Sequence, residues 1–368
     1  MAEPLYWIWH QQMFGVGTAR SHNVMEEWPD PEALYAACRA GEAVLTGGER
    51  ILAEKAMERA KRILHTTLKK GCDVITPDHP DYPPMLLHSY SKPAALYVKG
   101  DLGCLRDNLP IAMVGSRSYT EYGEKAAEYL AEGLACYGAT VVSGLAKGID
   151  SFCHGGALSV GGKTVGVLAC GLDIDYPRDS AALKRAIRDN GAVVSEYPMG
   201  TEPFRSRFPV RNRVIAGMCR GVVVVEAGED SGALITARLA ADMDREVFAV
   251  PGGIFKSGFA GANRLIQEGA KLVTSPMDIL MEYPEFAGLI TKKDTPQREV
   301  SKPEPQPLPA DIDPNVQKVY DAVETVPATA DSLAMATGQD IGDVLYALTE
   351  LELLGVIASH PGGLFTRF

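Results

Sequence analysis

The sequence lacks an excess of basic residues and lacks long apolar runs. Its 36 Lys and Arg stand against 47 Asp and Glu, which gives a net charge of -11. This balance argues against a protein that coats nucleic acid by bulk charge, so any site for a polyanion must be a focused groove. No apolar stretch approaches the ~20 residues of a membrane-spanning helix, and no basic segment with a following apolar run marks a signal peptide.

The cysteines do not have the spacing of a disulfide framework or of a zinc site. None of the seven cysteines forms a Cys-x-x-Cys pair, and their number is odd. We therefore expect neither a disulfide framework nor a zinc site, and interpret these residues as buried, reduced thiols of a cytoplasmic protein. They are Cys38, Cys72, Cys104, Cys136, Cys153, Cys170 and Cys219.

The patterns of several enzyme classes are missing as well. Gly115-Ser-Arg-Ser-Tyr119 has one glycine followed by bulky side chains, which does not fit the Gly-x-Gly-x-x-Gly fingerprint of a dinucleotide site. Gly-x-x-x-x-Gly-Lys-Ser/Thr, Gly-x-Ser-x-Gly and His-Glu-x-x-His do not occur. We expect no catalytic residues, no cofactor and no metal.

What the sequence does contain is a regular alternation of apolar runs and helical segments over residues 110–280. The runs are continuous, which indicates strands buried on both faces, as in a parallel sheet. The alternation predicts an α/β fold, a Rossmann-like doubly wound parallel sheet. The predicted strands are Ile111–Val114, Thr140–Val142, Thr164–Leu168, Ala192–Val194, Val222–Val225, Glu246–Val250 and Lys271–Val273.

Other regions flank this core. Residues 1–71 indicate an N-terminal helical module, and residues 72–283 an extended Rossmann-like domain in which two extended pieces, 73–76 and 95–98, bridge onto the core. Residues 284–314 hold seven prolines and predict a linker. Residues 315–368 predict three helices and a hairpin, which is a winged-helix arrangement.

One turn of the N-terminal module has a second interpretation. Met13-Phe-Gly-Val-Gly17 resembles a helix-hairpin-helix turn, in which backbone N–H groups at a helix start meet a phosphate. A single turn of this kind is a weak signal. We favour the alternative, a small helical bundle with a glycine turn.

Ligands of a doubly wound sheet bind beyond the carboxyl ends of the strands. Glycine loops, helix N-termini and cationic side chains follow those ends here, and they suit several phosphates. The alternative is that the glycines only permit tight turns. In strand order the segments are 115–117, 143–150, 171–177, 203–217, 231–236 and 251–253.

The segment 203–217 carries four arginines within nine residues, at 205, 207, 211 and 213. Arginine makes forked contacts to phosphate and stacks on bases. Phe204 and Phe208 lie among the arginines, a mixture typical of single-strand grooves. The alternative is that they pair internally with Glu196 and Glu226. We expect this segment to lie with the others beyond the carboxyl ends of the strands, an edge that we call the rim. That position argues against internal pairing for Arg211 and Arg213, though not for Arg207.

Three other polar groups have simpler interpretations than catalysis or metal binding. We expect Asp150 to cap the helix that follows it, and His154 to be a packed histidine rather than a base. Asp173 and Asp175 are spaced like a weak metal pair without a third ligand, so a solvated loop is the favoured interpretation.

These residues resemble those of the DprA/Smf family, the bacterial DNA-processing proteins of natural transformation. The resemblance covers most of the chain, from the helical module to the winged helix. Its motifs are Val114–Arg117, Ser143–Asp150 with His154 and Ala157-Leu158, Gly171–Pro177, Phe208–Arg213 with Ile215–Gly217, Ser231–Ala237, and Pro251-Gly252 to Asn263–Ile266 with Gly269-Ala270.

The resemblance implies a non-catalytic Rossmann-like protein that binds single-stranded DNA and forms a homodimer. It further implies that the protein protects incoming DNA and delivers it to the RecA recombinase. It also implies the contacts. Side chains would come from Arg117, Lys147, Arg205, Phe208, Arg211, Asn212 and Arg213, and backbone from Gly115, Ser116, Gly144, Gly148 and Gly232. Phosphates would lie on Arg117, Lys147, Arg211 and Arg213, and a base would stack on Phe208.

Three positions depart from the family pattern. Lys147 stands where arginine is common, which keeps the charge and loses the fork. Ala262 replaces a usual threonine, and Gly155 stands where a larger polar residue is common.

The C-terminal region does not have the charge of a duplex-DNA reader. Residues 310–368 hold two basic and nine acidic residues, and residues 340–354 hold four acids and no Lys or Arg. Such a helix would repel duplex DNA. We expect this winged helix to be a protein–protein module or a docking partner for the basic rim.

A second function stays open from the sequence. The central domain also resembles nucleotide-processing proteins of the same broad Rossmann-like group. A nucleoside-monophosphate hydrolase or sensor would need a carboxylate in its pocket as acid or base, and Glu196 and Glu226 are the candidates.

Overall fold

The computed structural model describes residues 2–42, 45–289, 312–323, 328–354, 356–360 and 364–367. The chain divides into two compact units, Met1–Thr295 and Pro296–Phe368. Of the predicted linker 284–314, residues 290–311 lie outside the described residues. Within the described parts, no helix is both long enough and apolar enough for a membrane crossing.

A nine-stranded sheet runs through the first unit in the order β1-β2-β6-β5-β4-β3-β7-β8-β9. All seven predicted strands are present, and they form the parallel part of the sheet. The strands are β1 (Asp73–Ile75), β2 (Leu96–Gly100), β3 (Pro110–Val114), β4 (Thr140–Ser143), β5 (Lys163–Leu168), β6 (Gly191–Ser195), β7 (Gly221–Val224), β8 (Glu246–Ala249) and β9 (Lys271–Leu272).

The two predicted extended pieces, residues 73–76 and 95–98, are confirmed as strands β1 and β2, and they join the sheet rather than only bridging onto it. Strand β2 pairs antiparallel with β6, and β1 pairs antiparallel with β2. Both pieces therefore extend the sheet. Their apolar residues join its hydrophobic cores, which is why short strands between prolines are stable here.

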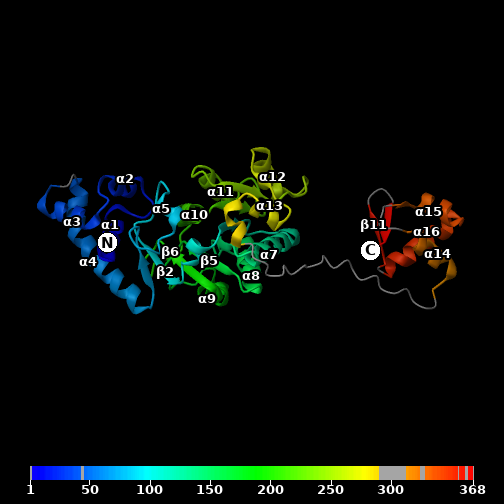
Figure 1. Cartoon of the computed structure of the whole chain (residues 1–368), viewed down its shortest axis with the longest axis horizontal. Helices are drawn as coiled ribbons and strands as arrows, with labels where there is room; N and C mark the ends of the chain where they lie inside the picture. Colours follow the sequence, from blue (N-terminus) through cyan, green and yellow to red (C-terminus); the bar gives the residue numbers. More distant parts are fainter. Residues whose placement is uncertain are drawn as a thin grey trace. The chain divides into compact units, whose positions relative to one another are not determined.

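Helices cover both faces of the sheet (Figure 1). Successive strand residues point to opposite faces, so Val114 packs under α10 and α11 while Met113 packs under α7 and α8. This is why the strands are apolar throughout. The helices are α5 (Pro84–Leu87), α6 (Cys104–Asp107), α7 (Glu121–Cys136), α8 (Ile149–Ser159), α9 (Ala181–Asn190), α10 (Arg207–Met218), α11 (Gly232–Ala241), α12 (Ala260–Gln267) and α13 (Pro276–Leu280), with short 3₁₀ turns η1 (Arg178–Ser180), η2 (Ser257–Phe259) and η3 (Pro284–Leu289).

The N-terminal helices lie at one end of the sheet, beside β2 and β6 (Figure 1). They share a hydrophobic core with the sheet. The side chain of buried Gln11 donates to the carbonyls of Ala95 (3.1 Å) and Glu196 (3.0 Å), and accepts from the hydroxyl of Tyr97 (2.9 Å). These helices are α1 (Pro4–Phe14), α2 (Ala19–Glu27), α3 (Pro31–Ala40) and α4 (Gly47–Lys69).

The glycine turn between α1 and α2 packs against α10. Gly17 has a φ of +63°, and a Cβ there would lie 2.6 Å from Val210 Cγ1 and 2.9 Å from Arg213 Nε. The hydroxyl of Thr18 accepts from the N–H of Ser21 at 3.0 Å, so the start of α2 is capped by its own chain. These contacts favour the interpretation of this turn as part of a packed helical bundle.

The second unit has the predicted three helices and hairpin strands around its own small core. Its sheet has the order β10-β12-β11. The elements are α14 (Pro314–Ala322), β10 (Ala328–Thr329), α15 (Ala330–Thr337), α16 (Ile341–Leu353), β11 (Ile357–His360) and β12 (Leu364–Arg367). The predicted hairpin turn at 361–363 lies outside the described residues.

Candidate nucleic-acid interface

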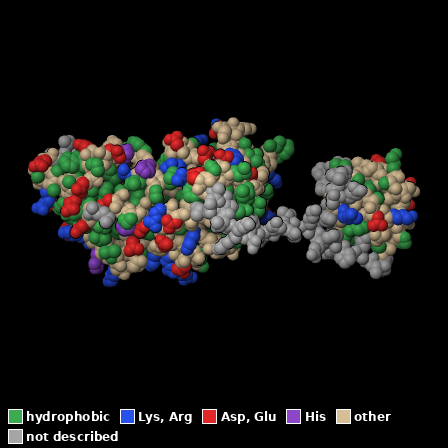
Figure 2. Space-filling model, in the orientation of Figure 1, with side chains coloured by type: hydrophobic (Ala, Val, Ile, Leu, Met, Phe, Trp, Pro, Cys, Tyr) green, Lys and Arg blue, Asp and Glu red, His purple; other side chains and the backbone are tan. Residues whose placement is uncertain are grey.

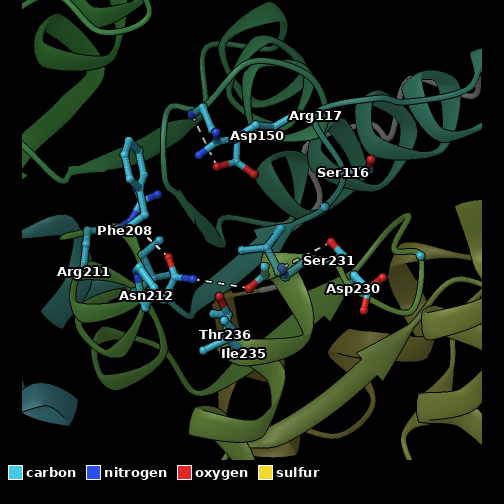
Figure 3. A pocket seen from close by; sticks show the side chains of 18 of the residues that line it. Ser116, Arg117, Asp150, Phe208, Arg211, Asn212, Asp230, Ser231, Ile235 and Thr236 are labelled. Carbon is cyan, nitrogen blue, oxygen red and sulfur yellow. Dashed lines mark hydrogen bonds between the residues drawn. The ribbon is translucent and has the colours of Figure 1, made fainter. Parts of the chain in front are cut away.

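A cavity of about 560 Å³ opens at the carboxyl ends of β3 and β7 (Figure 3). These neighbouring strands continue into helices on opposite faces of the sheet, α7 after β3 and α11 after β7. Such a switch point is where doubly wound sheets bind ligands. The cavity is lined by Val114, Gly115, Ser116, Arg117, Ser118, Ala146, Asp150, Phe208, Pro209, Arg211, Asn212, Ile215, Gly228, Glu229, Asp230, Ser231, Gly232, Ala233, Ile235 and Thr236.

Arg117 and Phe208 form a stacked pair at this cavity. The exposed guanidinium of Arg117 lies 4.9 Å from the centroid of the half-buried Phe208 ring. Tyr176 contacts the same ring, with centroids 5.6 Å apart. The stacking partner Tyr176 was not predicted, although its place in the loop after β5 puts it on the same rim.

Arg211 is buried, with 5% of its surface exposed. Its side chain lines the cavity and also forms hydrogen bonds to backbone carbonyls. Its Nη1 donates to the carbonyl of Gly144 at 2.6 Å and to that of Val167. Burial lowers the pKa of Arg211 to about 10, and the carboxylate of Asp150 acts in the opposite direction. The guanidinium therefore keeps its charge at neutral pH and ties the loop after β4 to strand β5.

Arg213 is paired internally, so the expectation that its place on the rim argues against pairing is wrong. Its guanidinium donates to the carboxylate of Glu196 and to the carbonyl of Ser91. Both charged side chains are buried, with 7% of Arg213 and 4% of Glu196 exposed. The cause is geometric, because Arg213 lies two residues after Arg211 on α10, where a helix turns its side chains about 200° apart. It does not line the cavity.

The remaining predicted cations lie outside the cavity lining. Lys147 and Arg205 are exposed. Half-buried Arg207 lies 4.9 Å from the ring of Phe204 and 5.3 Å from that of Tyr197, and it also donates to the carbonyl of Glu202. Arg207 is therefore held by aromatic rings and backbone.

Two glycines of the predicted set are required by close approach. A Cβ on Gly144 would lie 2.3 Å from Nη1 of Arg211, and Gly148 has a φ of +91° with a Cβ position 2.5 Å from the carbonyl oxygen of Ser116. Both let the loop after β4 pass close to its neighbours. Of the other predicted backbone positions, Gly115, Ser116 and Gly232 line the cavity.

Asn212 connects α10 to the start of α11. Its amide donates to the carbonyl of Gly232 at 3.3 Å and its oxygen accepts from Nε of Arg211 at 3.2 Å (Figure 3). The hydroxyl of Ser231 accepts from the N–H of Ala233 and caps α11. The cavity therefore has a helix N-terminus on one side and the arginine pair Arg117 and Arg211 on the other.

Acidic groups also reach this cavity, and sequence reasoning missed two of them. Glu229 and Asp230 are exposed in the loop before α11 and line the cavity. They directly precede Ser231 in the sequence, which was the available signal. Because they repel phosphates, a bound polyanion would lie on the side of Arg117 rather than over this loop.

Asp150 organises the loop before its helix rather than capping the helix. Its carboxylate accepts from the N–H groups of Gly144 (3.1 Å) and Ala146 (3.4 Å), while the N-cap residue of α8 is Gly148. Burial raises the pKa of Asp150, and Arg211 opposes that shift. The expectation of a simple cap is therefore wrong.

The groups considered for other chemistry are held in structural contacts. His154 is buried with Nδ1 2.7 Å from the hydroxyl of Thr164, and burial lowers its pKa to about 3. Asp173 pairs with Lys70 (2.6 Å) and Asp175 with Lys184 (3.1 Å). Over the described ranges, no three His, Cys, Asp or Glu residues gather as a metal site.

The two carboxylates that a nucleotide hydrolase would need do not line the cavity. Glu196 is paired with Arg213, and burial raises its pKa against the effect of that arginine. Glu226 is buried and accepts from the N–H (3.0 Å) and hydroxyl (2.9 Å) of Thr120 at the start of α7. This placement does not favour an acid–base role for either residue.

Charge elsewhere on the surface is mixed. Figure 2 shows Lys and Arg interspersed with Asp and Glu over the described residues of the visible face. A polyanion site must therefore be local, as the net charge of the chain already implies.

This chain is similar to known protein families and to known proteins. Residues 73–284 match the family described as DNA recombination-mediator protein A, and residues 302–363 match the DprA winged helix domain. The chain is 42% identical over 291 residues to Protein Smf of Escherichia coli, covering 79% of this chain and 76% of that protein. It is 32% identical over 394 residues to Protein Smf of Synechocystis, covering 100% and 99%.

Two solved structures are similar as well. The X-ray structure of DNA processing protein A from Streptococcus pneumoniae has a TM-score of 0.63 at 37% identity, covering 77% of this chain and 99% of that chain. A structure concerning the single-stranded DNA binding mode of DNA processing protein A from Helicobacter pylori has a TM-score of 0.52 at 28% identity, covering 58% and 96%.

Proposed function

This chain belongs to the DprA/Smf family of DNA-processing proteins, and from that premise we propose that it binds single-stranded DNA at the cavity between β3 and β7. One observation carries the proposal. Exposed Arg117 stacks on Phe208 at the mouth of a cavity at the sheet's switch point. The similar Helicobacter pylori protein, whose structure concerns a single-stranded DNA binding mode, supports it.

The proposed role of each residue follows from how exposed its side chain is. Arg117, Lys147 and Arg205 are exposed and contact phosphates. Arg211 contributes a buried positive charge and keeps the loop of Gly144 in place. A base stacks on Phe208, which is typically worth about 1–3 kcal/mol, and it displaces the guanidinium of Arg117 toward the phosphates.

The proposed contact set differs from the predicted one at Arg213, whose pairing with Glu196 makes it structural. Asn212 acts through its bond to Gly232, which orients the start of α11. The backbone of Gly115, Ser116 and Gly232 faces the strand at the cavity wall, while Gly144 and Gly148 shape the loop that carries Lys147.

The proposal is tested by salt-titrated fluorescence anisotropy with single-stranded and duplex oligonucleotides of one sequence. We expect tighter binding of the single strand, with a log–log salt slope of about -0.7 per neutralised phosphate. Arg117→Glu should weaken binding and reduce that slope by about 0.7.

The matched control is Arg238→Glu. Arg238 is an exposed arginine on α11 outside the cavity lining, so this variant makes the same charge change away from the site. Equal affinities of the Arg117→Glu and Arg238→Glu variants would refute the proposed site. Equal affinity of the wild type for single strand and duplex would refute the proposed function.

We further propose, from what the family resemblance implies, that the protein is a homodimer. The edge strand β9 and helix α13 support a contact there, because Leu272, Met277 and Met281 are exposed large apolar side chains. Leu272→Arg should convert a dimer to a monomer in sedimentation velocity. Leu68→Arg, at an exposed position on α4, should not.

We also propose, from what the family resemblance implies, that the protein delivers the bound strand to the RecA recombinase. It predicts that the protein shortens the lag of RecA assembly on single strands covered by a single-strand binding protein. The Arg117→Glu variant should lose this effect. An unchanged lag with the wild-type protein would contradict the proposal.

We propose binding rather than catalysis as the activity. The contact residues are arginines, a lysine, an aromatic ring and backbone, which suit a strand held without a bond being broken. Release of free base from nucleotides by the purified protein would favour a hydrolase instead.

A further inference from the structure

Helix α4 carries a row of polar and basic side chains that the proposed site does not use. Positions 55, 59, 62, 66 and 69 follow the i, i+3, i+4 spacing that brings side chains onto one helix face. All five residues are exposed, whereas Ala56, Ala60 and Thr67 on another face are buried. We call this row the α4 stripe; it consists of Lys55, Arg59, Arg62, Thr66 and Lys69.

The α4 stripe holds four cations and no acid, although Glu58 beside it interacts electrostatically with Arg62. Lys61 and Glu58 form an ion pair within α4 at 2.9 Å, and neither residue belongs to the stripe. Among the described residues, the four stripe cations make no ion pair or side-chain hydrogen bond. Like charges at this spacing destabilise a helix. In a chain of net charge -11, four such cations point to an anionic ligand.

The stripe also borders a second cavity. A hollow of about 320 Å³ is lined on the α4 side by Arg59, Arg62, Ile63 and Thr66, with Gln12 from α1. Pro198, Met199 and Thr201, from the loop between β6 and α10, form its other wall. The two arginine heads therefore stand at the edge of a groove rather than on a convex surface.

That second wall belongs to the loop that leads to the proposed DNA site. After Thr201 the chain continues to Phe204, which is 59% exposed and lies under the guanidinium of Arg207. It then enters α10, where Phe208 lines the first cavity. The segment between the two cavities therefore carries exposed Phe204 and Arg205, together with the exposed acid Glu202.

We infer that the α4 stripe is a second contact surface for the phosphate backbone of single-stranded DNA, on the same path as the cavity between β3 and β7. The inference rests on the proposed function. Its chemistry is a row of exposed cations, two of them arginines at a groove, with exposed Phe204 on the segment that leads to the first cavity. Cations combined with an aromatic ring are what single-strand grooves use. An acidic protein surface would use the cations but would not need the aromatic ring.

The path predicts that the stripe matters only for strands long enough to reach it. The test compares oligothymidylates of about 6 and about 30 nucleotides; the first is near the lower end of the roughly 4–16 nucleotides that single-strand sites cover, and the second exceeds that range. In the Arg59→Glu/Arg62→Glu variant we expect at least a tenfold loss of affinity for the longer strand. Its log–log salt slope should fall by about 1.4, which is two phosphate contacts. Binding of the shorter strand should change less than twofold.

The control variant is Lys61→Glu/Lys125→Glu. It changes the net charge by the same amount at exposed lysines outside both cavities. We expect wild-type affinity for both strands. Tryptophan fluorescence on heating verifies the fold of each variant, since Trp7, Trp9 and Trp28 all lie in the first unit.

Each outcome has a separate meaning. Equal affinity of the stripe variant and the control for the longer strand overturns the inference and assigns the stripe to another class of partner, such as an acidic protein. An equal loss on both strand lengths also overturns it, because the stripe would then not be a separate contact. A wild-type protein that binds neither strand refutes the proposed function instead.

Discussion

Replacing Arg213 with alanine tests the division between structural and DNA-contacting arginines. Arg213 is 7% exposed and pairs with Glu196, which is 4% exposed. Removal of the guanidinium leaves a buried carboxylate without its partner. We therefore expect Arg213→Ala to lower the free energy of unfolding of the first unit, whereas Arg117→Ala should leave it unchanged because Arg117 is exposed.

The size of the effect follows from the protonation of Glu196. Burial already raises the pKa of this carboxyl and Arg213 opposes the shift. Without Arg213 the carboxyl takes up a proton, which at pH 7 costs about 3.7 kcal/mol for an ordinary pKa near 4.3. This agrees with the roughly 3–5 kcal/mol found when one partner of a buried pair is removed. Because protonation is easier in acid, the loss should shrink by about 1.4 kcal/mol per pH unit, to about 2.3 kcal/mol at pH 6.

The assay is urea unfolding followed by tryptophan fluorescence at pH 7 and pH 6. All three tryptophans lie in the first unit, so the signal reports on that unit. The control is Arg264→Ala, which breaks an exposed pair with Glu268 and should cost less than about 1 kcal/mol.

A double variant separates the buried charge from lost packing. Arg213→Ala/Glu196→Gln removes both charges and should recover most of the stability that Arg213→Ala loses. The reasoning is wrong if Arg213→Ala costs no more than Arg264→Ala. It is also wrong if the cost does not change with pH and the double variant shows no recovery.

Two further predictions concern pH and the second unit. His10 and His154 are buried and burial lowers the pKa of each to about 3; since the unfolded histidines take up protons below about pH 6.5, stability should fall by about 1.4 kcal/mol per histidine per pH unit between pH 6.5 and pH 4. Replacing either histidine with glutamine should reduce that slope in acid urea titrations, and an unchanged slope would contradict the assignment. Helix α16 has exposed Leu345 and Tyr346 and no Lys or Arg, so the fragment 310–368 should bind neither duplex nor single-stranded DNA at physiological salt; measurable affinity in gel shift would refute its interpretation as a protein-docking module.

The sequence by itself determined the arrangement of the rim. Apolar runs separated by helices predict parallel strands, and the carboxyl ends of parallel strands meet at one edge. Gly115, Arg117, Phe208 and Gly232 could therefore be placed around one site from their positions after β3, β6 and β7, and the structure brings them to one cavity. The family motifs lie in these same segments, which is why fold and family were predicted together.

Only the tertiary structure decided which side chains face that cavity. Arg211 and Arg213 look equivalent in the sequence, yet the turn of α10 directs one toward the cavity and the other to Glu196. Likewise, the spacing of Arg59 and Arg62 defines a helix face, but only the packing of α4 beside the loop of Met199 makes that face one side of a groove. Periodicity along a chain is local, whereas the partner of a side chain depends on elements far away in the sequence.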